Sequence, residues 1–239
     1  MQKTKLNRFI QKYNLNGNVN SVKWSAKDNT LSTKFVTSDK SLMGTVTVDN
    51  LQMDDGDVGV YTTDQLVKLL GVLGEDVTMD VSRAGDKAYS LKVKNGVVSI
   101  DYTLSDLSVI PDPPQLKRLP DFQTQIKVDS SFIDTFIKGK SALSEAETFT
   151  IVNGNRGPEV IIGFSSTNSN RVNIPVEVTS NGLTDNISFN ANLFRDVLSA
   201  NKECTSATLE VSNDGLARIN FKVDDYDSTY YVVATQGVD

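Results

Sequence analysis

One structural unit occurs twice along this chain of 239 residues. Each copy is an amphipathic helix followed by short alternating strands and a tight turn. The first copy spans residues 60–102 and the second spans residues 187–234. A hairpin signal stands at a comparable point in each, Asn95-Gly96 and Asp214-Gly215. These pairs supply the positive φ angles that two-residue hairpin turns require. The repeat therefore predicts a pseudo-symmetric protein made of two similar halves.

The length and the prolines predict where the two halves meet. A chain of this size suits two domains of about 110 residues each. Four of the six prolines fall within residues 109–122. Proline fixes φ and lacks an amide donor, so this stretch cannot be a helix or a central strand. We expect an N-terminal domain at 1–108, an extended connector at 109–122 and a C-terminal domain at 123–239.

Two residue types constrain the chemistry by their scarcity. There is no histidine, which removes the usual general base, the Ser-His-Asp arrangement and most zinc sites. Cys204 is the single cysteine, so no intramolecular disulfide and no cysteine metal cluster can form. We expect Cys204 to be a small buried hydrophobe. The sequence predicts a non-enzymatic protein with no metal and no cofactor.

The hydropathy pattern indicates a protein of the cytoplasm. No apolar run approaches the roughly 20 residues that span a bilayer. The first five residues are basic, but an amphipathic stretch follows them rather than an apolar signal region. Hydrophobic residues make up 38% of the chain, which is enough for packed cores. We expect a soluble protein.

Apolar periodicity predicts four helices set among many strands. Three helices are expected at 3–13, 64–73 and 191–202, and the second is expected to be capped by Thr63. A further helix follows Asp129, its expected cap, and buries Phe132, Ile133, Phe136 and Ile137. Alternating segments predict strands at 19–25, 30–37, 42–49, 76–82, 87–93, 97–103, 123–128, 148–153, 159–164, 171–178, 206–212, 216–223 and 228–235.

The distribution of charge matters more than the net charge of −6. An acidic chain is a poor general nucleic-acid binder, because such domains tend to be basic. The helix at 3–13, however, holds bases and no acid. The acids gather in two loops, around residues 54–57 and 224–227. This segregation suits a protein that meets DNA phosphate on one surface and repels it on another.

Taken together, the chain resembles a known family, the sliding clamps (DNA polymerase processivity factors) of T-even-like tailed bacteriophages, which share the fold of proliferating cell nuclear antigen. The element order is similar over nearly the whole chain. The sequence is most similar at Val-Gly-Val-Tyr (58–61), through 65–73 and 75–77, and at the terminal Tyr-Tyr-Val-Val-Ala (230–234).

The resemblance implies an α+β, ring-forming protein with two similar domains of the DNA-clamp fold. Each domain has two helices backed by antiparallel sheets, and three chains form a homotrimer around duplex DNA. It implies a bacteriophage DNA-replication protein in the host cytoplasm, a polymerase accessory protein that an ATP-dependent clamp loader places on DNA. The residues expected to face DNA are Lys3, Lys5, Arg8, Lys12, Lys68, Lys138, Lys140, Arg195 and Lys202.

The resemblance also implies a pocket between the domains that accepts a short peptide of a partner such as the polymerase. It would lie beneath the connector and beside the last strand. The residues that match this location are Val109, Ile110, Pro111, Tyr230, Tyr231, Val232, Val233 and Ala234.

Two other functions remain open on the sequence. A structural or scaffold β-rich oligomer of a phage particle would share the repeat and the acidity. A carboxylate-dependent hydrolase would use Asp54, Asp55 and Asp57, or Asp224, Asp225 and Asp227. Both acidic groups lie in turns, where carboxylates are commonly only solvated. The loop at 53–57 also lacks the spaced ligands and the closing Glu of a calcium loop.

Overall fold

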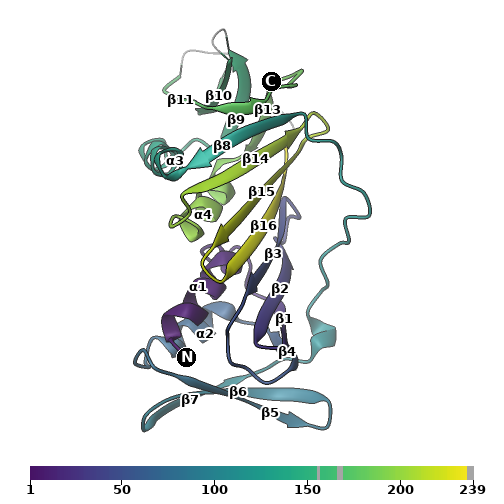
Figure 1. Ribbon diagram of the computed structural model, residues 1–239, viewed down its shortest axis with the longest axis vertical. Helices are drawn as coiled ribbons and strands as arrows, with labels where there is room; N and C mark the ends of the chain where they lie inside the picture. The colour runs from purple at the N-terminus through teal and green to yellow at the C-terminus, as the bar shows by residue number, and fades with distance from the viewer. Residues whose placement is uncertain (155–156, 166–168, 236–239) are drawn as a thin grey trace. The chain divides into compact units, whose positions relative to one another are not determined.

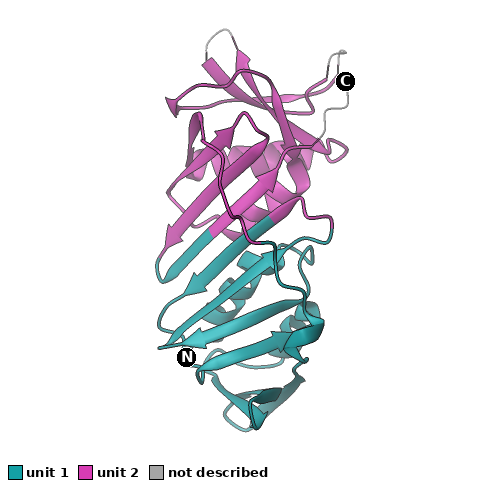
Figure 2. Ribbon diagram, turned by 90° about the vertical axis from the view of Figure 1, so that its right-hand side faces the viewer, with its two compact units in different colours: residues 1–38, 43–114, 224–228 teal, residues 39–42, 115–223, 229–239 magenta. Residues whose placement is uncertain are grey.

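The computed structural model describes residues 1–154, 157–165 and 169–235, which form two compact units (Figures 1 and 2). The first unit consists of residues 1–38, 43–114 and 224–228. The second contains residues 39–42, 115–223 and 229–239, as far as they are described. The described residues form four α-helices and antiparallel sheets, so the predicted α+β class is confirmed.

In the first unit, two helices lie beside two antiparallel sheets. One sheet contains the run β3-β2-β1-β4, and the other has the order β5-β6-β7. The elements are α1 (Lys3–Asn14), β1 (Val22–Lys27), β2 (Thr30–Val36), β3 (Leu42–Val48), β4 (Gly56–Val60), α2 (Thr63–Leu70), β5 (Thr78–Ala84), β6 (Lys87–Asn95), β7 (Val98–Thr103) and the 3-10 turn η1 (Leu107–Val109).

The core of the first unit is built around aromatic side chains of α1. Phe9 and Tyr13 lie on the apolar stripe of this helix and are fully buried. The rings of Phe9 and Trp24 meet edge to face, with centroids 5.7 Å apart. Trp24 Nε1 donates to the Tyr13 hydroxyl over 3.3 Å. Burial raises the pKa of that hydroxyl, so it stays neutral and can hydrogen-bond inside the core.

The second unit repeats this arrangement with its own helices and sheets. One sheet contains the run β12-β8-β14-β15-β16, and the other has the order β11-β10-β9-β13. The elements are β8 (Thr124–Asp129), α3 (Ser130–Ala142), β9 (Thr148–Gly154), β10 (Gly157–Ile162), β11 (Val172–Pro175), β12 (Val178–Ser180), β13 (Ile187–Asn190), α4 (Ala191–Ala200), β14 (Ser206–Ser212), β15 (Leu216–Val223) and β16 (Tyr226–Val233), of which residues 229–233 belong to this unit.

Stacked phenylalanines form the centre of the second core. Phe149 of β9 stacks on Phe194 of α4 with ring centroids 4.8 Å apart. Phe136 of α3 meets both rings edge to face, at 5.2 and 5.1 Å. These contacts attach both helices to the same sheet, so α3 and α4 lie side by side. Cys204 is buried near the end of α4, as predicted.

The predicted helices are confirmed, with corrections at their ends. Helix α1 extends one residue beyond the prediction, whereas α2 ends at Leu70 and α4 at Ala200. The predicted cap Thr63 is instead the first residue of α2. Its hydroxyl faces the core and donates to the Asn20 carbonyl over 2.9 Å, so it cannot cap the helix. Asp129 does cap α3, accepting from Phe132 N over 2.8 Å.

Both predicted hairpins form, but their turns differ from the prediction. In the first, Asn95 pairs with Val98, which leaves a two-residue loop with φ of 57° at Gly96. In the second, Ser212 pairs with Leu216, so the loop has three residues and ends at Gly215, where φ is 79°. The glycines alone adopt the positive φ that we expected of the Asn-Gly and Asp-Gly pairs.

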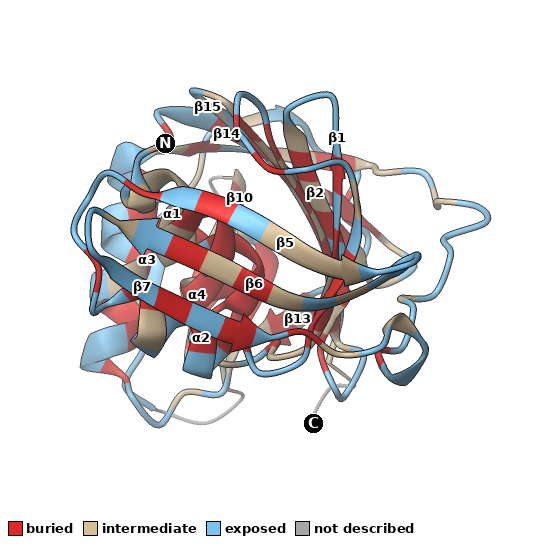
Figure 3. Ribbon diagram, turned by 90° about the horizontal axis from the view of Figure 1, so that it is seen from below, coloured by how far each residue is buried: buried red, intermediate tan, exposed pale blue. Residues whose placement is uncertain are grey.

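Most predicted strands form near their expected bounds, and β14 and β15 match them fully. Figure 3 shows the alternation of buried and exposed residues along β7. The strand predicted at 171–178 is wrong, because it splits at Pro175 into β11 and β12, which belong to different sheets. Strand β4 forms in a segment that overlaps the predicted acidic loop at 53–57. No helix of the described residues is long and apolar enough to cross a membrane.

The cap of α3 gives a test of this local structure. Asp129→Ala removes the acceptor for the Phe132 amide and should lower the free energy of unfolding by about 1 kcal/mol. Asp129→Asn keeps an acceptor at that place and should cost clearly less. Denaturant unfolding of the two variants and the wild type measures both effects. Equal losses would show that the hydrogen bond does not stabilise the helix.

Candidate nucleic-acid interface

Helix α1 carries four of the predicted DNA-facing residues, and all four contact other parts of the first unit. Lys3 donates to the Leu73 carbonyl. Lys5 forms an ion pair with Asp225. Arg8 donates through both Nη1 and Nη2 to one oxygen of Asp224, each over 3.2 Å. The bases of α1 therefore already hold partners within the first unit.

The acids that engage α1 come from the turn between β15 and β16. Asp225 also accepts from Asn50 Nδ2 over 3.2 Å. The hydrogen bond from Lys5, and then that from Asn50, lower the pKa of Asp225 below its usual range. Our prediction that this acidic loop is segregated from the bases of α1 is wrong. The acids of the turn bind the bases of α1, although more than 200 residues of sequence separate them.

Lys12 is the innermost base of α1. Only 1% of its surface is exposed, and its Nζ lies 5.2 Å from the centroid of the Tyr226 ring. Arg8 lies over the same ring at 4.6 Å. From this position, the Lys12 ammonium would have to leave the core to reach a phosphate.

In α3, two neighbouring lysines differ completely in exposure. Lys138 is exposed, but only 1% of Lys140 is. Lys140 Nζ donates to the carbonyls of Leu143 and Ser144 over 3.3 and 2.8 Å, so it binds the C-terminal end of its own helix. Burial, and then the charge of Arg195, lower the pKa of Lys140. These contacts give Lys140 a structural role at the end of α3.

The remaining predicted bases divide into one paired and two open residues. Arg195 of α4 donates from Nε and Nη2 to the buried carboxylate of Asp196, over 3.1 and 2.9 Å. Lys68 of α2 is exposed, and so is Lys202, which lies two residues beyond the end of α4. Lys68, Lys138 and Lys202 make no side-chain hydrogen bond or ion pair with the described residues. We call these three the open lysines.

The predicted peptide-pocket residues also differ in exposure. Ile110, Tyr230 and Val232 are buried, at 2%, 0% and 1% exposure, so their side chains pack in the core. The Tyr230 hydroxyl accepts from Asn201 Nδ2 within the second unit, over 2.9 Å. The others are exposed or half-buried: Val109, Pro111, Tyr231, Val233 and Ala234.

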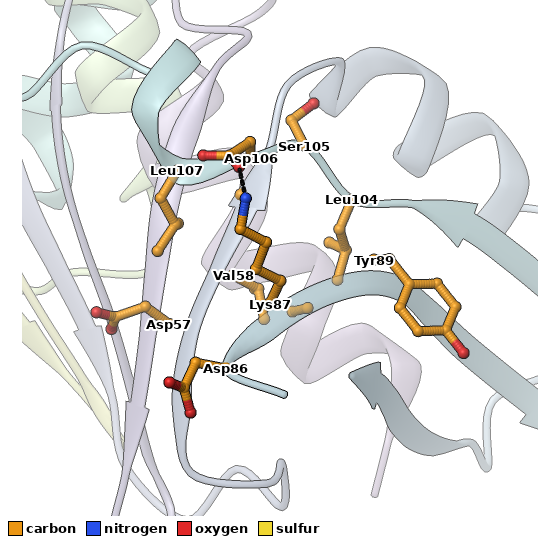
Figure 4. Close-up of a pocket in the computed structure, with 11 residues that line it drawn as sticks. Asp57, Val58, Asp86, Lys87, Tyr89, Leu104, Ser105, Asp106 and Leu107 are labelled. Carbon is orange, nitrogen blue, oxygen red and sulfur yellow. Dashed lines mark hydrogen bonds and ion pairs between the residues drawn. The ribbon is translucent and has the colours of Figure 1, made fainter. Parts of the chain in front are cut away.

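The structure contains a cavity that the sequence reasoning missed. It has a volume of about 370 Å³ and lies in the first unit beside β4, β6 and the segment before η1 (Figure 4). Val58 and Leu104 form part of its apolar wall, and Asp57 and Asp86 lie at its edge. Lys87 pairs with Asp106 over 3.0 Å. The cavity arises where three segments meet, and no local sequence pattern indicates such a meeting.

The acidic groups do not assemble into a metal site in the part of the chain that the structure describes. Among those residues, no three or more of His, Cys, Asp and Glu lie together in an arrangement that could hold a metal ion. Asp224 and Asp225 are engaged by Arg8 and Lys5. The described contacts of the 224–227 loop are therefore those of a turn packed on a helix.

The fold is similar to that of solved DNA sliding clamps. One is A. fulgidus PCNA (proliferating cell nuclear antigen) with the C-terminal region of FEN-1 bound, at a TM-score of 0.75 and 14% identity, covering 100% of this chain and 98% of that one. PCNA from Entamoeba histolytica has a TM-score of 0.75 at 12% identity, with 99% and 97% covered. The PCNA2–PCNA3 complex from Sulfolobus tokodaii has 0.73 at 9%, with 98% and 97% covered.

The chain thus has the clamp fold over its full length, and the fold prediction is confirmed. No protein-family model and no curated protein matches the sequence, so the comparisons show the clamp fold and no particular family within it. The closer resemblance to clamps of T-even-like bacteriophages stays a prediction.

The contrast between Lys138 and Lys140 can be measured. Lys140→Ala removes the donor to two carbonyls and the packed stem of the side chain. It should lower the free energy of unfolding by about 1–3 kcal/mol. Lys138→Ala, two residues away, should change it by less than about 0.5 kcal/mol. Denaturant unfolding compares the two, and equal effects would contradict the structural role of Lys140.

Proposed function

We propose that this protein is a sliding clamp that encircles duplex DNA and holds the replicative polymerase on its template. The observation that carries the proposal is the similarity of the fold to PCNA structures over 99–100% of this chain and 97–98% of theirs. We further propose that three copies form the ring, that 1–108 and 123–239 are its repeating domains, and that 109–122 connects them. The clamp would be non-enzymatic and would use no cofactor.

The charges support weak and non-specific contact with DNA. Contacts from Lys and Arg to the phosphate backbone attract duplex DNA regardless of its sequence. The open lysines lie on or just beyond three different helices, α2, α3 and α4. A few such contacts per copy give low affinity, which a sliding protein needs. Enclosure by the ring would then keep the clamp on DNA.

The mechanism follows from this enclosure. A polymerase tethered to a ring that cannot leave the DNA rebinds its template at a high effective concentration. The polymerase would dock through a short peptide, in the way that FEN-1 contributes its C-terminal region to A. fulgidus PCNA. An ATP-dependent loader would open the ring and place it on DNA.

Side-chain exposure supports a smaller DNA-facing set than the one expected from the sequence. The open lysines are its most accessible members: Lys68, Lys138 and Lys202. Lys5, Arg8 and Arg195 are partly exposed but paired with acids. Lys3 is also partly exposed and is bound to a carbonyl. Lys12 and Lys140 are left out because they are buried.

One observation favours the alternative, a structural or scaffold oligomer of a phage particle. The bases of α1 bind acids of the same fold, so α1 does not present a surface of bare positive charge. A purely structural protein would use ion pairs in this way. The three open lysines, on or just beyond three separate helices, are what the structural alternative leaves unexplained.

The assembly state gives the first test. A ring of three copies predicts a species near three times the chain mass of 26.1 kDa at high protein concentration. Light scattering across a range of concentrations measures this mass, and dissociation on dilution would still be consistent with a ring. A monomer or a dimer at every concentration would remove the basis for enclosure.

The open lysines give the second test. Reversing them (K68E, K138E and K202E) should weaken binding to a labelled 30-base-pair duplex about tenfold or more at 50 mM salt, because each lost phosphate contact reduces counterion release. The matched control reverses three exposed lysines outside the helices, K27E, K34E and K117E. Fluorescence anisotropy over a salt series measures both. Equal weakening would show a general charge effect and would favour the structural alternative.

A further inference from the structure

We propose that the turn between β15 and β16 competes with DNA for the basic side of α1. In this inference, which rests on the proposed function, the carboxylates of Asp224 and Asp225 occupy the positions that DNA phosphates would take on Arg8 and Lys5. The turn lies against α1 (Figure 1). It would thereby set how tightly the clamp holds duplex DNA.

The two carboxylates bind α1 in the way that phosphate oxygens bind a basic helix. Arg8 directs both Nη1 and Nη2 at a single oxygen of Asp224, each over 3.2 Å, and Lys5 Nζ is bound to Asp225 Oδ2. Lys5 and Arg8 are three residues apart, so they lie on the same side of the helix. Arginine and lysine bind phosphate with these same donors. A carboxylate and a phosphate cannot both hold them in this geometry.

The turn is attached to the first unit independently of its charges. The Asp225 carbonyl accepts from Asp49 N over 2.9 Å, and the Tyr226 hydroxyl donates to the Lys5 carbonyl over 2.8 Å. Tyr226 is itself only 4% exposed. The backbone and the tyrosine therefore hold the turn in place. Removing the carboxylate charges should not detach it.

Exposure shows which contact a phosphate would displace first. The Asp224 side chain is 68% exposed and that of Arg8 is 31% exposed. The Arg8 guanidinium also lies over the ring of Tyr226, which orients it. Asp224 can rotate into solvent while Arg8 stays in place. The Lys5–Asp225 pair is more enclosed, at 20% and 41%, and Asn50 also binds Asp225. A DNA phosphate would thus displace Asp224 from Arg8 before it displaced Asp225 from Lys5.

The consequence is a built-in limit on DNA affinity. Each cation that is paired with the turn makes one phosphate contact fewer with DNA. Each phosphate contact that is made steepens the slope of log K against log salt by about 0.9. The ion pairs and the DNA contacts weaken together as salt rises, because both are screened. The turn would keep the grip on DNA loose without removing the bases from the helix.

The test compares D224N/D225N with a control that makes the same change of charge elsewhere. The control is D54N/D86N, which alters two exposed aspartates whose side chains make no hydrogen bond or ion pair with the described residues. Both pairs change the formal net charge from −6 to −4, since two acids are neutralised. Anisotropy with a labelled 30-base-pair duplex is measured from 25 to 200 mM salt.

We expect D224N/D225N to bind the duplex about three- to tenfold more tightly than the wild type at low salt, with a salt slope steeper by about one to two. The control should change by less than about twofold. Adding K5Q and R8Q to the D224N/D225N variant should remove most of the gain. The single variant D224N, which alters the most exposed partner, repeats the test if the double variant is unstable.

The outcomes separate the two proposals. If the wild type binds the duplex and neither D224N/D225N nor D224N binds it more tightly than the control does, the turn does not compete with DNA. That result overturns this inference and does not affect the proposed clamp function. A gain that persists with K5Q and R8Q also overturns it, because the bound phosphate would then lie elsewhere. The absence of duplex binding by the wild type and by every variant, at all salt concentrations, also overturns this inference, because the turn would then have no DNA contact to limit. The proposed function is overturned separately, by a monomer or a dimer at every concentration in the light-scattering experiment.

Discussion

Burial of one apolar side of each helix against a sheet is the constraint on which the rest of the structure depends. In the first unit, Phe9 and Tyr13 of α1 meet Trp24 of β1. In the second, Phe136 and Phe194 bring α3 and α4 onto Phe149 of β9. Large rings bury much apolar surface and prefer a few relative orientations, so they fix both the position and the rotation of a helix. The rotation in turn decides which lysines reach the solvent.

Local patterns predict what local physics controls. Helix α1, strands β14 and β15 and the Asp129 cap follow from periodicity and capping chemistry, and the structure confirms them. The errors also have local causes. Pro175 marks the point where a predicted strand divides, and the Thr63 hydroxyl faces the core instead of the helix end.

The candidate interface was less predictable, because its properties depend on contacts between distant segments. Lys138 and Lys140 are equivalent in a list of bases, yet one is open and the other binds carbonyls at the end of its helix. The sequence predicts that the loop with Asp224 and Asp225 repels phosphate. In the structure these two acids instead pair with Arg8 and Lys5 of α1, the bases expected to attract phosphate. A sequence gives the inventory of charges, whereas only the fold gives their pairing.

Cys204 has a practical consequence for the study of this protein in motion. It is the chain's single cysteine, is 1% exposed, and its Sγ donates to the Ser206 carbonyl over 3.3 Å. A buried thiol in such surroundings reacts slowly with labelling reagents. The natural chain therefore gives little background reaction with thiol reagents. A cysteine introduced at an exposed site would accept a fluorophore or a spin label selectively, and distances between copies could be followed without first removing a native residue.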